Sequence, residues 1–297
     1  MILRKIVILL TSICISLIVK AGKPVSPDIR LFTSGQIDKA LEMIYSFNFK
    51  EAASLADQIG FEKDIEKELA ELNLLWWQGL TYGVDNRFLK DLTTFSETLI
   101  ESKPDIHTIA PRQVFLILLA GTYRIRLAAI ENDKTAALRT FIKITPGLKA
   151  VLAKSFEYEE YALLAGVYNY TVGGVKNNYI LLRPFFVFLP QANADTGREL
   201  LQKCAGSQDL TIATEAHYFL YKIEYEVFNN QVEAEKHLMW LTRKYPENII
   251  FKLDLLRMYT RDKKSTSDLR QDIENTIQRS QLSKDQKDYL RQILSGI

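Results

Sequence analysis

Apolar residues recur at the three- and four-residue spacing of an α-helix from about residue 32 to the end of the chain. The alternation of apolar and polar residues that marks a half-buried strand is almost absent, and Leu, Ala, Glu and Lys dominate. The 297 residues include only 13 Gly and 8 Pro, too few for a fold built on many tight turns. The sequence therefore predicts an all-α protein of long helices.

Composition places the chain among proteins that bury a core. Hydrophobic residues make up 47% and charged residues 25%, which is ordinary for a globular protein. The formal net charge is +2, and no block of Lys and Arg resembles a nucleic-acid-binding arm. We therefore expect no nucleic-acid partner.

The N-terminus has the pattern of a secretory signal peptide. Arg4 and Lys5 precede an apolar run over residues 6–19, and the residues just before position 22 resemble a small-residue cleavage site. The run is shorter than the roughly 18 apolar residues expected of a membrane span. We predict a signal peptide at 1–21, a linker at 22–31, and export to the periplasm or cell envelope. An uncleaved N-terminal anchor is the alternative.

Cleavage would change both the charge and the thiol content. Removing residues 1–21 removes three basic residues and no acidic one, which changes the net charge from +2 to −1. It also removes Cys14 and leaves Cys204 alone, so an internal disulfide is excluded in the mature chain. We therefore expect packing to supply the stability of the protein.

Two stretches resemble tetratricopeptide (TPR) repeats. Gly79 and Tyr82 are three residues apart, with Phe95 and Pro104 downstream, as in the packing skeleton of one such helix pair. A second match follows the pattern Tyr218, Tyr221, Tyr225, Ala234, Leu238, Leu241, Tyr245, Pro246. The resemblance implies a single helical repeat domain at 32–297, an α-solenoid of degenerate TPR-like helix pairs.

The same pattern predicts where helices begin and end. Gly173 and Gly174 are expected to form a loop after a helix, and Ser283 to start a C-terminal capping helix. The predicted helices are 34–46, 49–59, 64–83, 86–102, 111–131, 134–155, 157–172, 180–189, 194–205, 210–229, 231–245, 248–260, 266–280 and 283–294.

A second resemblance covers about residues 157–262. The order of Gly, Pro, Leu and Ala positions there resembles the C-terminal half of the inclusion-body-clearance family of TPR-like proteins. The residues that carry it are Gly166, Asn169, Pro184, Gly197, Leu200, Leu201, Glu215, Ala216, Tyr245 and Pro246. The resemblance implies a non-enzymatic helical repeat with an interaction role, although this chain lacks the long N-terminal region of that family.

Motifs for catalysis or metal binding are not found. The three histidines, His107, His217 and His237, form no i, i+4 pair with one another or with a cysteine, and no phosphate-binding or serine-nucleophile motif occurs. Cys204 and His217 are interpreted as packing residues. The acidic residues Glu157, Glu159 and Glu160 are interpreted as helix-dipole partners. We expect a non-enzymatic protein without cofactor or metal; a periplasmic enzyme with a helical fold is the alternative.

Two apolar stretches bear on membrane contact. The stretch 114–120 is interpreted as part of a buried central helix. Residues 179–190 include Phe185, Phe186 and Phe188, which could form a lipid-contacting wedge. A peripheral membrane protein that docks through this segment is the third hypothesis.

The leading hypothesis is a scaffold that binds a protein or an extended peptide in a concave groove. In TPR-like units the first helix of each pair lines the groove, and Tyr82, Tyr123, Tyr168 and Tyr225 set the register. The side chains expected to face the partner are Trp76, Ile117, Arg124, Asn169, Phe219 and Glu226.

Overall fold

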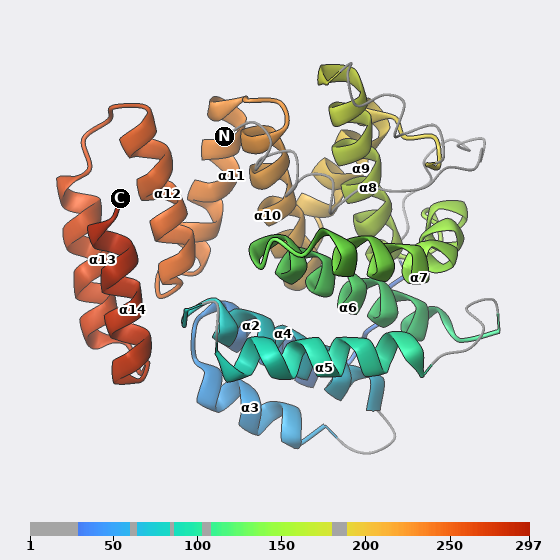
Figure 1. The fold of residues 1–297 in the computed structure, drawn as a ribbon, viewed down its shortest axis with the longest axis horizontal. Coiled ribbons are helices and arrows are strands. Elements are labelled where there is room, and N and C mark those ends of the chain that lie inside the picture. The colour runs from blue at the N-terminus through green and yellow to red at the C-terminus, as the bar shows by residue number, and fades with distance from the viewer. Residues whose placement is uncertain (1–28, 60–63, 84–85, 103–107, 180–188) are drawn as a thin grey trace. The chain divides into compact units, whose positions relative to one another are not determined.

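The computed structural model describes residues 29–59, 64–83, 86–102, 108–179 and 189–297, which form thirteen α-helices and no strand (Figure 1). The all-α prediction is therefore confirmed. The helices are α2 (Gly35–Tyr45), α3 (Phe49–Asp57), α4 (Asp64–Gly79), α5 (Arg87–Glu101), α6 (Pro111–Ile130), α7 (Lys134–Ala153), α8 (Glu159–Asn178), α9 (Ala194–Ala205), α10 (Leu210–Glu226), α11 (Gln231–Lys244), α12 (Ile249–Arg261), α13 (Ser267–Arg279) and α14 (Lys284–Ser295). Residues 180–188 of the helix predicted at 180–189 lie outside the described residues, and Leu189 is not helical.

Short polar residues fix where many helices begin. A side-chain oxygen at the N-cap accepts a hydrogen bond from a backbone N–H of the first turn, which would otherwise have no partner. The predicted N-cap Ser283 is confirmed, and Gln286 returns a bond to the Ser283 backbone to complete a capping box. The residues that cap in this way are Ser34, Asp133, Asn193, Asp209, Asn230, Asn248 and Ser283.

The chain divides into two compact units, each made from two separate segments. Unit 1 combines Met1–Thr33 with Leu92–Asn229, and unit 2 combines Ser34–Asp91 with Asn230–Ile297. The chain passes from unit 2 into unit 1 within α5. Each unit therefore depends on contacts between residues that are far apart in the sequence.

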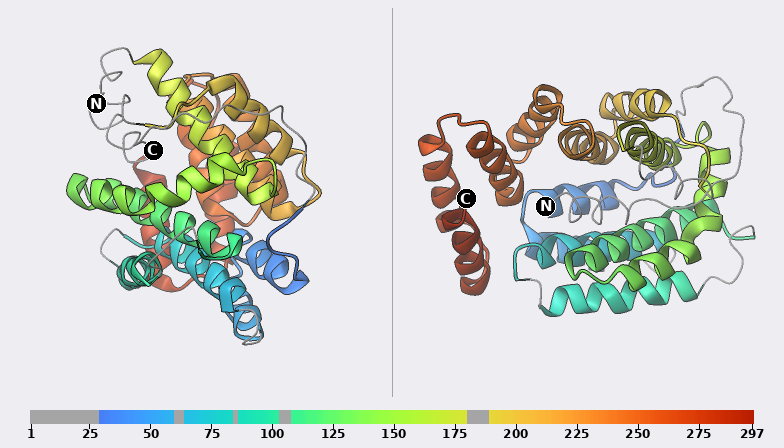
Figure 2. Two further views of the ribbon diagram at one scale, coloured as in Figure 1. Left: turned by 90° about the vertical axis from the view of Figure 1, so that its right-hand side faces the viewer. Right: turned by 45° about the horizontal axis from the view of Figure 1, so that its top comes forward.

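Unit 2 is joined by a cluster of aromatic side chains from both of its segments. Tyr45 at the end of α2 lies 5.4 Å from Tyr245, and Trp77 of α4 lies 5.4 Å from Phe251, both measured between ring centroids. The Asn248 amide donates a buried hydrogen bond of 2.8 Å to the Tyr45 carbonyl oxygen. Beyond this cluster, α11 to α14 pack in sequence order, as Figure 2 shows for α12, α13 and α14.

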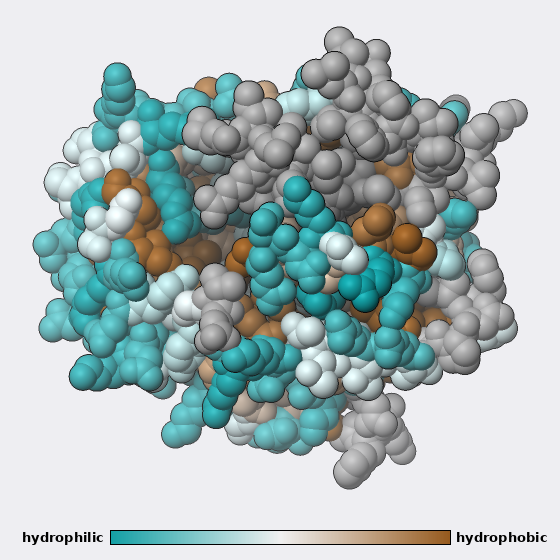
Figure 3. All heavy atoms as spheres, viewed as in Figure 1, coloured by the Kyte–Doolittle hydropathy of each residue, from teal (hydrophilic) through white to brown (hydrophobic). Residues whose placement is uncertain are grey.

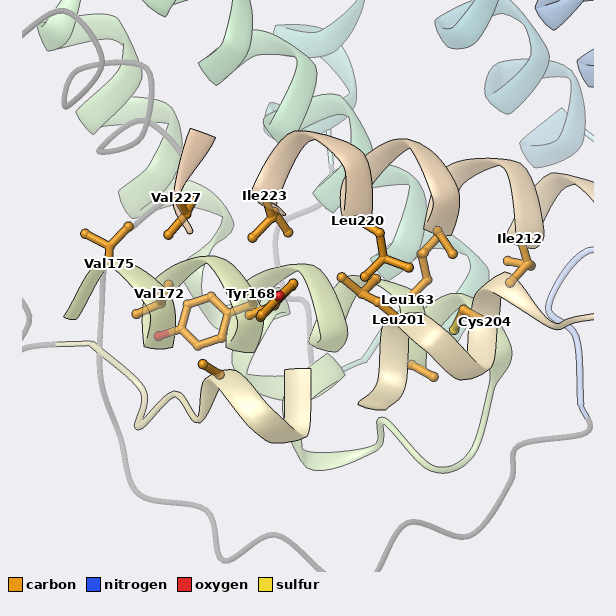
Figure 4. Packing of buried hydrophobic residues seen from close by; sticks show 14 of the residues in the cluster. Leu163, Tyr168, Val172, Val175, Leu201, Cys204, Ile212, Leu220, Ile223 and Val227 are labelled. Carbon is orange, nitrogen blue, oxygen red and sulfur yellow. The ribbon is translucent and has the colours of Figure 1, made fainter. Parts of the chain in front are cut away.

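The core of unit 1 lies among α8, α9 and α10. Leu163 and Val172 of α8, Leu201 of α9, and Leu220 and Ile223 of α10 are all buried and point toward one another (Figure 4). Helices α6 and α7 pack against each other, and α7 also contacts α8. The close packing of α8 on both α9 and α10 makes α8 the central helix of this core.

The prediction of a loop at Gly173 and Gly174 is wrong, because α8 continues through both glycines to Asn178. No described glycine has a positive φ, so these residues are not turn residues. A Cβ on Gly173 would lie 2.4 Å from the Ala194 backbone nitrogen, and one on Gly197 would lie 2.1 Å from that of Tyr170. The glycines are needed because α8 and the start of α9 approach each other backbone to backbone.

Helix α6 contains the apolar stretch 114–120. Every residue of that stretch is buried, which confirms its interpretation as part of a core helix. Among the described residues, α6 is the one helix long and apolar enough to cross a membrane. Its most apolar 18-residue window is 72% buried within the protein, as expected of the core helix of a globular unit.

Candidate functional site

The apolar residues predicted to line a groove are mostly core residues. Trp76 of α4 is 2% exposed and Ile117 of α6 is 3% exposed, and they belong to different units. Phe219 of α10 is partly buried and packs on the hydrophobic core of unit 1. Neither Trp76 nor Ile117 has enough exposed surface to contact a partner.

The polar residues predicted for the groove bond within the chain. Arg124 is 8% exposed and forms an ion pair with Glu97, with 3.1 Å between its Nε and the carboxylate oxygen. The Asn169 amide donates to the Ala165 carbonyl and its Oδ1 accepts from the backbone of Asn193. Glu226 is the last residue of α10 and is half-buried. The structure therefore assigns internal partners to Arg124 and Asn169.

A different part of unit 1 binds a non-helical segment, which is residues 29–33 of the chain itself, hereafter the anchored segment. It is neither helix nor strand. The Glu160 carboxylate accepts hydrogen bonds from the backbone N–H groups of Leu31 at 2.9 Å and Phe32 at 3.2 Å. The N–H of Glu159, at the first turn of α8, donates to the Ile29 carbonyl at 3.0 Å. The start of α8 thus binds the backbone of this segment on both its donor and acceptor sides.

Two side chains of the anchored segment have partners on other helices. Arg30 forms an ion pair with Asp209, the N-cap residue of α10. The Phe32 ring packs on Phe115 of α6 with ring centroids 5.7 Å apart, and the Arg112 guanidinium lies 5.9 Å from its centroid. The site therefore recognises a cation and an aromatic ring two residues apart.

The electrostatics of the site follow from its burial. Glu160 is 3% exposed, and the loss of solvent raises the pKa of its carboxyl above the ordinary value of 4.5. The N–H groups of Leu31 and Phe32 oppose that rise because they stabilise the charged form, while the negative charge of Asp209 adds to it. The anchored segment thus supplies most of the polar groups that compensate for a buried carboxylate.

The sequence pattern alone did not reveal this site. Glu159 and Glu160 stand in the first turn of α8, as the helix-dipole interpretation requires, but Glu160 also binds the segment 129 residues upstream. Composition predicts a linker at 22–31, whereas the structure shows Ile29, Arg30 and Leu31 bound to unit 1. In the sequence, the one signal is that Arg30 and Phe32 are two residues apart within the four residues that precede the N-cap Ser34.

Cys204 has the properties of a packing residue. It is 5% exposed in the core of unit 1, and burial raises the pKa of its thiol to about 12. The thiolate, which is the nucleophilic form, is therefore not populated at neutral pH. His217 lies on α10 and is half-buried. Among the described residues, no group of three or more His, Cys, Asp or Glu is arranged to hold a metal ion.

The predicted membrane-docking segment is mostly outside the description. Phe185, Phe186 and Phe188 fall within residues 180–188, which are not described. The flanking residues Leu189 and Pro190 are buried, and the Pro190 carbonyl accepts a hydrogen bond of 2.8 Å from the Tyr168 hydroxyl.

Comparison with known proteins adds no relative. No protein-family model matches the chain, and neither a curated protein nor a solved structure gives a significant match.

Proposed function

We propose that this protein is an exported, TPR-like scaffold that binds an extended peptide or a peptide-like segment of a protein partner in the cell envelope. The observation that supports the proposal is the anchored segment, because unit 1 already binds the backbone and side chains of a short non-helical peptide. Export is inferred from the signal-like pattern of residues 1–21, which lie outside the described residues.

The contacts to the anchored segment are those of peptide recognition. Arg30 and Phe32, two residues apart, contact different partners, at the start of α10 and on α6. Backbone recognition by Glu160 and by the N–H of Glu159 supplies affinity, and the partners of Arg30 and Phe32 supply specificity. This arrangement favours ligands with an Arg-x-aromatic sequence.

Small residues at helix contacts support the repeat architecture. Ala234 of the second TPR-like match is fully buried, and Ala40, Ala120 and Ala165 on other helices are at most 1% exposed. A Cβ on Gly79 would lie 2.3 Å from the Leu89 side chain, so Gly79 leaves room for Leu89 in the first turn of α5. Both features are typical of stacked helix pairs.

The proposal is tested by peptide binding in trans. A covalently attached segment competes at an effective concentration of about 1 mM, so wild-type protein should bind an added peptide weakly. The double substitution Arg30→Asp and Phe32→Ser should release the segment. A fluorescent peptide with the sequence of residues 27–33 should then bind to the full-length variant, as measured by fluorescence anisotropy.

The control variants change the side chains that bind the anchored segment and leave the segment itself intact. Glu160→Gln keeps a hydrogen-bond acceptor but removes the charge, and Asp209→Asn removes the partner of Arg30. We call the Arg30→Asp, Phe32→Ser protein the release variant. When Asp209→Asn is introduced into it, peptide binding should weaken by about tenfold, because one charged pair with the peptide is lost. Circular dichroism verifies folding. The proposal fails if a folded release variant binds no peptide, or if it binds a scrambled peptide equally well.

A further inference from the structure

Exposed hydrophobic side chains are concentrated in one stretch of unit 1. Six large hydrophobic residues are strongly exposed in the described part of the chain, and four of them lie within residues 130–156. Two of the four, Leu138 and Ile142, are 52% and 55% exposed on α7 itself. Ile130 and Phe156 lie just before and just after this helix, at 44% and 51% exposed. The stretch therefore differs from the rest of the surface.

Helix α7 carries apolar side chains on two faces, one buried and one exposed. Its inner face buries Ala137, Phe141 and Ile144. Leu138 and Ile142, together with the exposed Pro146, are spaced four residues apart, which places successive side chains about 40° apart around the helix. The three residues thus form one stripe on the exposed side of α7.

The charged side chains of α7 itself are all basic. Helix α7 contains Lys134, Arg139, Lys143 and Lys149 and no acidic residue. Lys143 pairs with Glu101 at 2.6 Å, and the other three form no ion pair with a described residue. The outer face of α7 is therefore apolar in the middle and positively charged beside it. Figure 3 shows a surface on the side of Figure 1 that is mostly hydrophilic, with hydrophobic groups confined to small separate areas.

We propose that the outer face of α7 docks on the surface of an anionic lipid bilayer, with the helix axis parallel to the membrane plane. A helix with apolar residues on one face and Lys or Arg beside them inserts its apolar side chains at the headgroup level and attracts anionic lipids with its charges. Complementarity of charge selects an anionic surface. The stripe carries only two large side chains, so it is shallow, as a peripheral contact requires.

This surface is separate from both sites considered above. It does not include the anchored segment or its partners, and it lies outside residues 179–190. Membrane docking through α7 would hold the peptide-binding unit against the envelope. Its test does not depend on peptide binding, so either proposal can fail alone.

Vesicle binding tests the proposal in the full-length protein. Vesicles with 30% phosphatidylglycerol in phosphatidylcholine should sediment the protein, and pure phosphatidylcholine should sediment much less. The double substitution Leu138→Ser and Ile142→Ser should weaken binding by at least about tenfold, because both side chains lose their transfer into the bilayer. Arg139→Gln with Lys149→Gln should weaken binding by about tenfold and reduce its salt dependence.

Two controls separate this contact from other membrane contacts. Val232→Ser removes a side chain that is 66% exposed on α11, beside the acidic residues Glu233 and Glu235, and should leave binding unchanged. Residues 6–19 are present in every variant, so differences between variants report α7. Hydroxyl-radical footprinting should show that vesicles protect Leu138 and Ile142 from oxidation but not Val232.

Several results would overturn the proposal. These are equal binding of wild type and the Leu138→Ser, Ile142→Ser variant, absence of binding to anionic vesicles, and protection confined to residues 6–19 or 180–188. Protection of Leu138 that depends on protein concentration without vesicles would also overturn it, because the face would then contact a second copy of the chain.

Discussion

Helices α7 and α8 are both 20 residues long and follow each other in unit 1, yet they differ in how they are covered. Helix α8 packs on α7, α9 and α10 and buries residues around most of its circumference. Helix α7 packs on α6 and α8 and leaves Leu138 and Ile142 exposed. An apolar helix therefore becomes a core helix only where enough neighbouring helices cover it, and its own composition does not specify those neighbours.

The chemistry of the two helices differs accordingly. Helix α8 carries Gly166, Gly173 and Gly174 at its contacts and places Glu160 in its first turn. Helix α7 places its cations on the outside. Because α8 is buried and the outer face of α7 is exposed, substitutions around α8 should change the free energy of unfolding, and substitutions on the outer face of α7 should not.

The largest effect is expected at the contact between α8 and α9. Gly197→Val places atoms where the Tyr170 backbone lies, so the two helices must separate. The free energy of unfolding should fall by about 3 kcal/mol or more, as measured by urea denaturation. Gly35→Ala is the matched control, since nothing lies within 4 Å of its added Cβ, and it should be neutral or stabilising. Equal effects at both glycines would contradict the backbone-to-backbone contact.

The next effect is expected at Glu160. Glu160→Ala leaves the buried N–H groups of Leu31 and Phe32 without an acceptor, which should lower the free energy of unfolding by about 2–3 kcal/mol. Glu160→Gln retains an acceptor and should cost less. Thermal or urea denaturation of the two variants measures the difference, and an Ala variant as stable as wild type would show that the anchored segment is not held here.

Glu160 also predicts a pH dependence. Because its pKa is raised in the folded protein, the folded state binds more protons than the unfolded state between pH 4.5 and the raised value. The contribution of this residue to stability should therefore increase as the pH falls through that window. The difference in unfolding free energy between wild type and Glu160→Gln, followed from pH 7 to pH 4, isolates it. A difference that moves the other way would contradict the burial of the charged form.

A smaller effect is expected at Cys204, in the core beside α8. The thiol is buried and its pKa is about 12, so native protein should not react with a thiol reagent at Cys204 at pH 8, whereas unfolded protein should. Cys204→Ala should cost about 1 kcal/mol, a typical value for one small buried side chain. Peptide mapping after labelling distinguishes Cys204 from Cys14. Rapid native labelling would show that this part of the core is open.

The smallest effect is expected on the outer face of α7. Ile142→Ser should change the free energy of unfolding by no more than about 0.5 kcal/mol, because the side chain is already 55% exposed. Ile144→Ser, two residues away on the inner face, should cost several times more, since Ile144 is 5% exposed. Chemical denaturation of the pair measures the contrast. Similar losses in both would show that α7 is covered on its outer side as well.

These structural details change the interpretation of the proposed groove. The TPR-like register predicts that Trp76 faces a partner, but it is 2% exposed in unit 2. Its replacement by Ala would mainly test core packing. The register of residues on one helix follows from the sequence, whereas the direction in which each face points depends on which helices pack against it.

The helices of this protein and most of their ends could be predicted from the sequence. Periodicity placed the helices, and Ser283 marked the start of the last one, because helix formation and capping depend on residues that are close together in the chain. Burial of the Val114–Ala120 stretch was predictable for the same reason.

The contacts between distant segments are visible only in the tertiary structure. The Asn248–Tyr45 bond, the binding of Leu31 by Glu160, and the continuation of α8 through Gly173 all depend on partners far away in the sequence. In the sequence alone, a glycine that ends a helix looks the same as a glycine that allows a second helix to pack closely. They are distinguished by the backbone that lies against them, since a Cβ on Gly173 would meet the start of α9 at a distance no side chain tolerates.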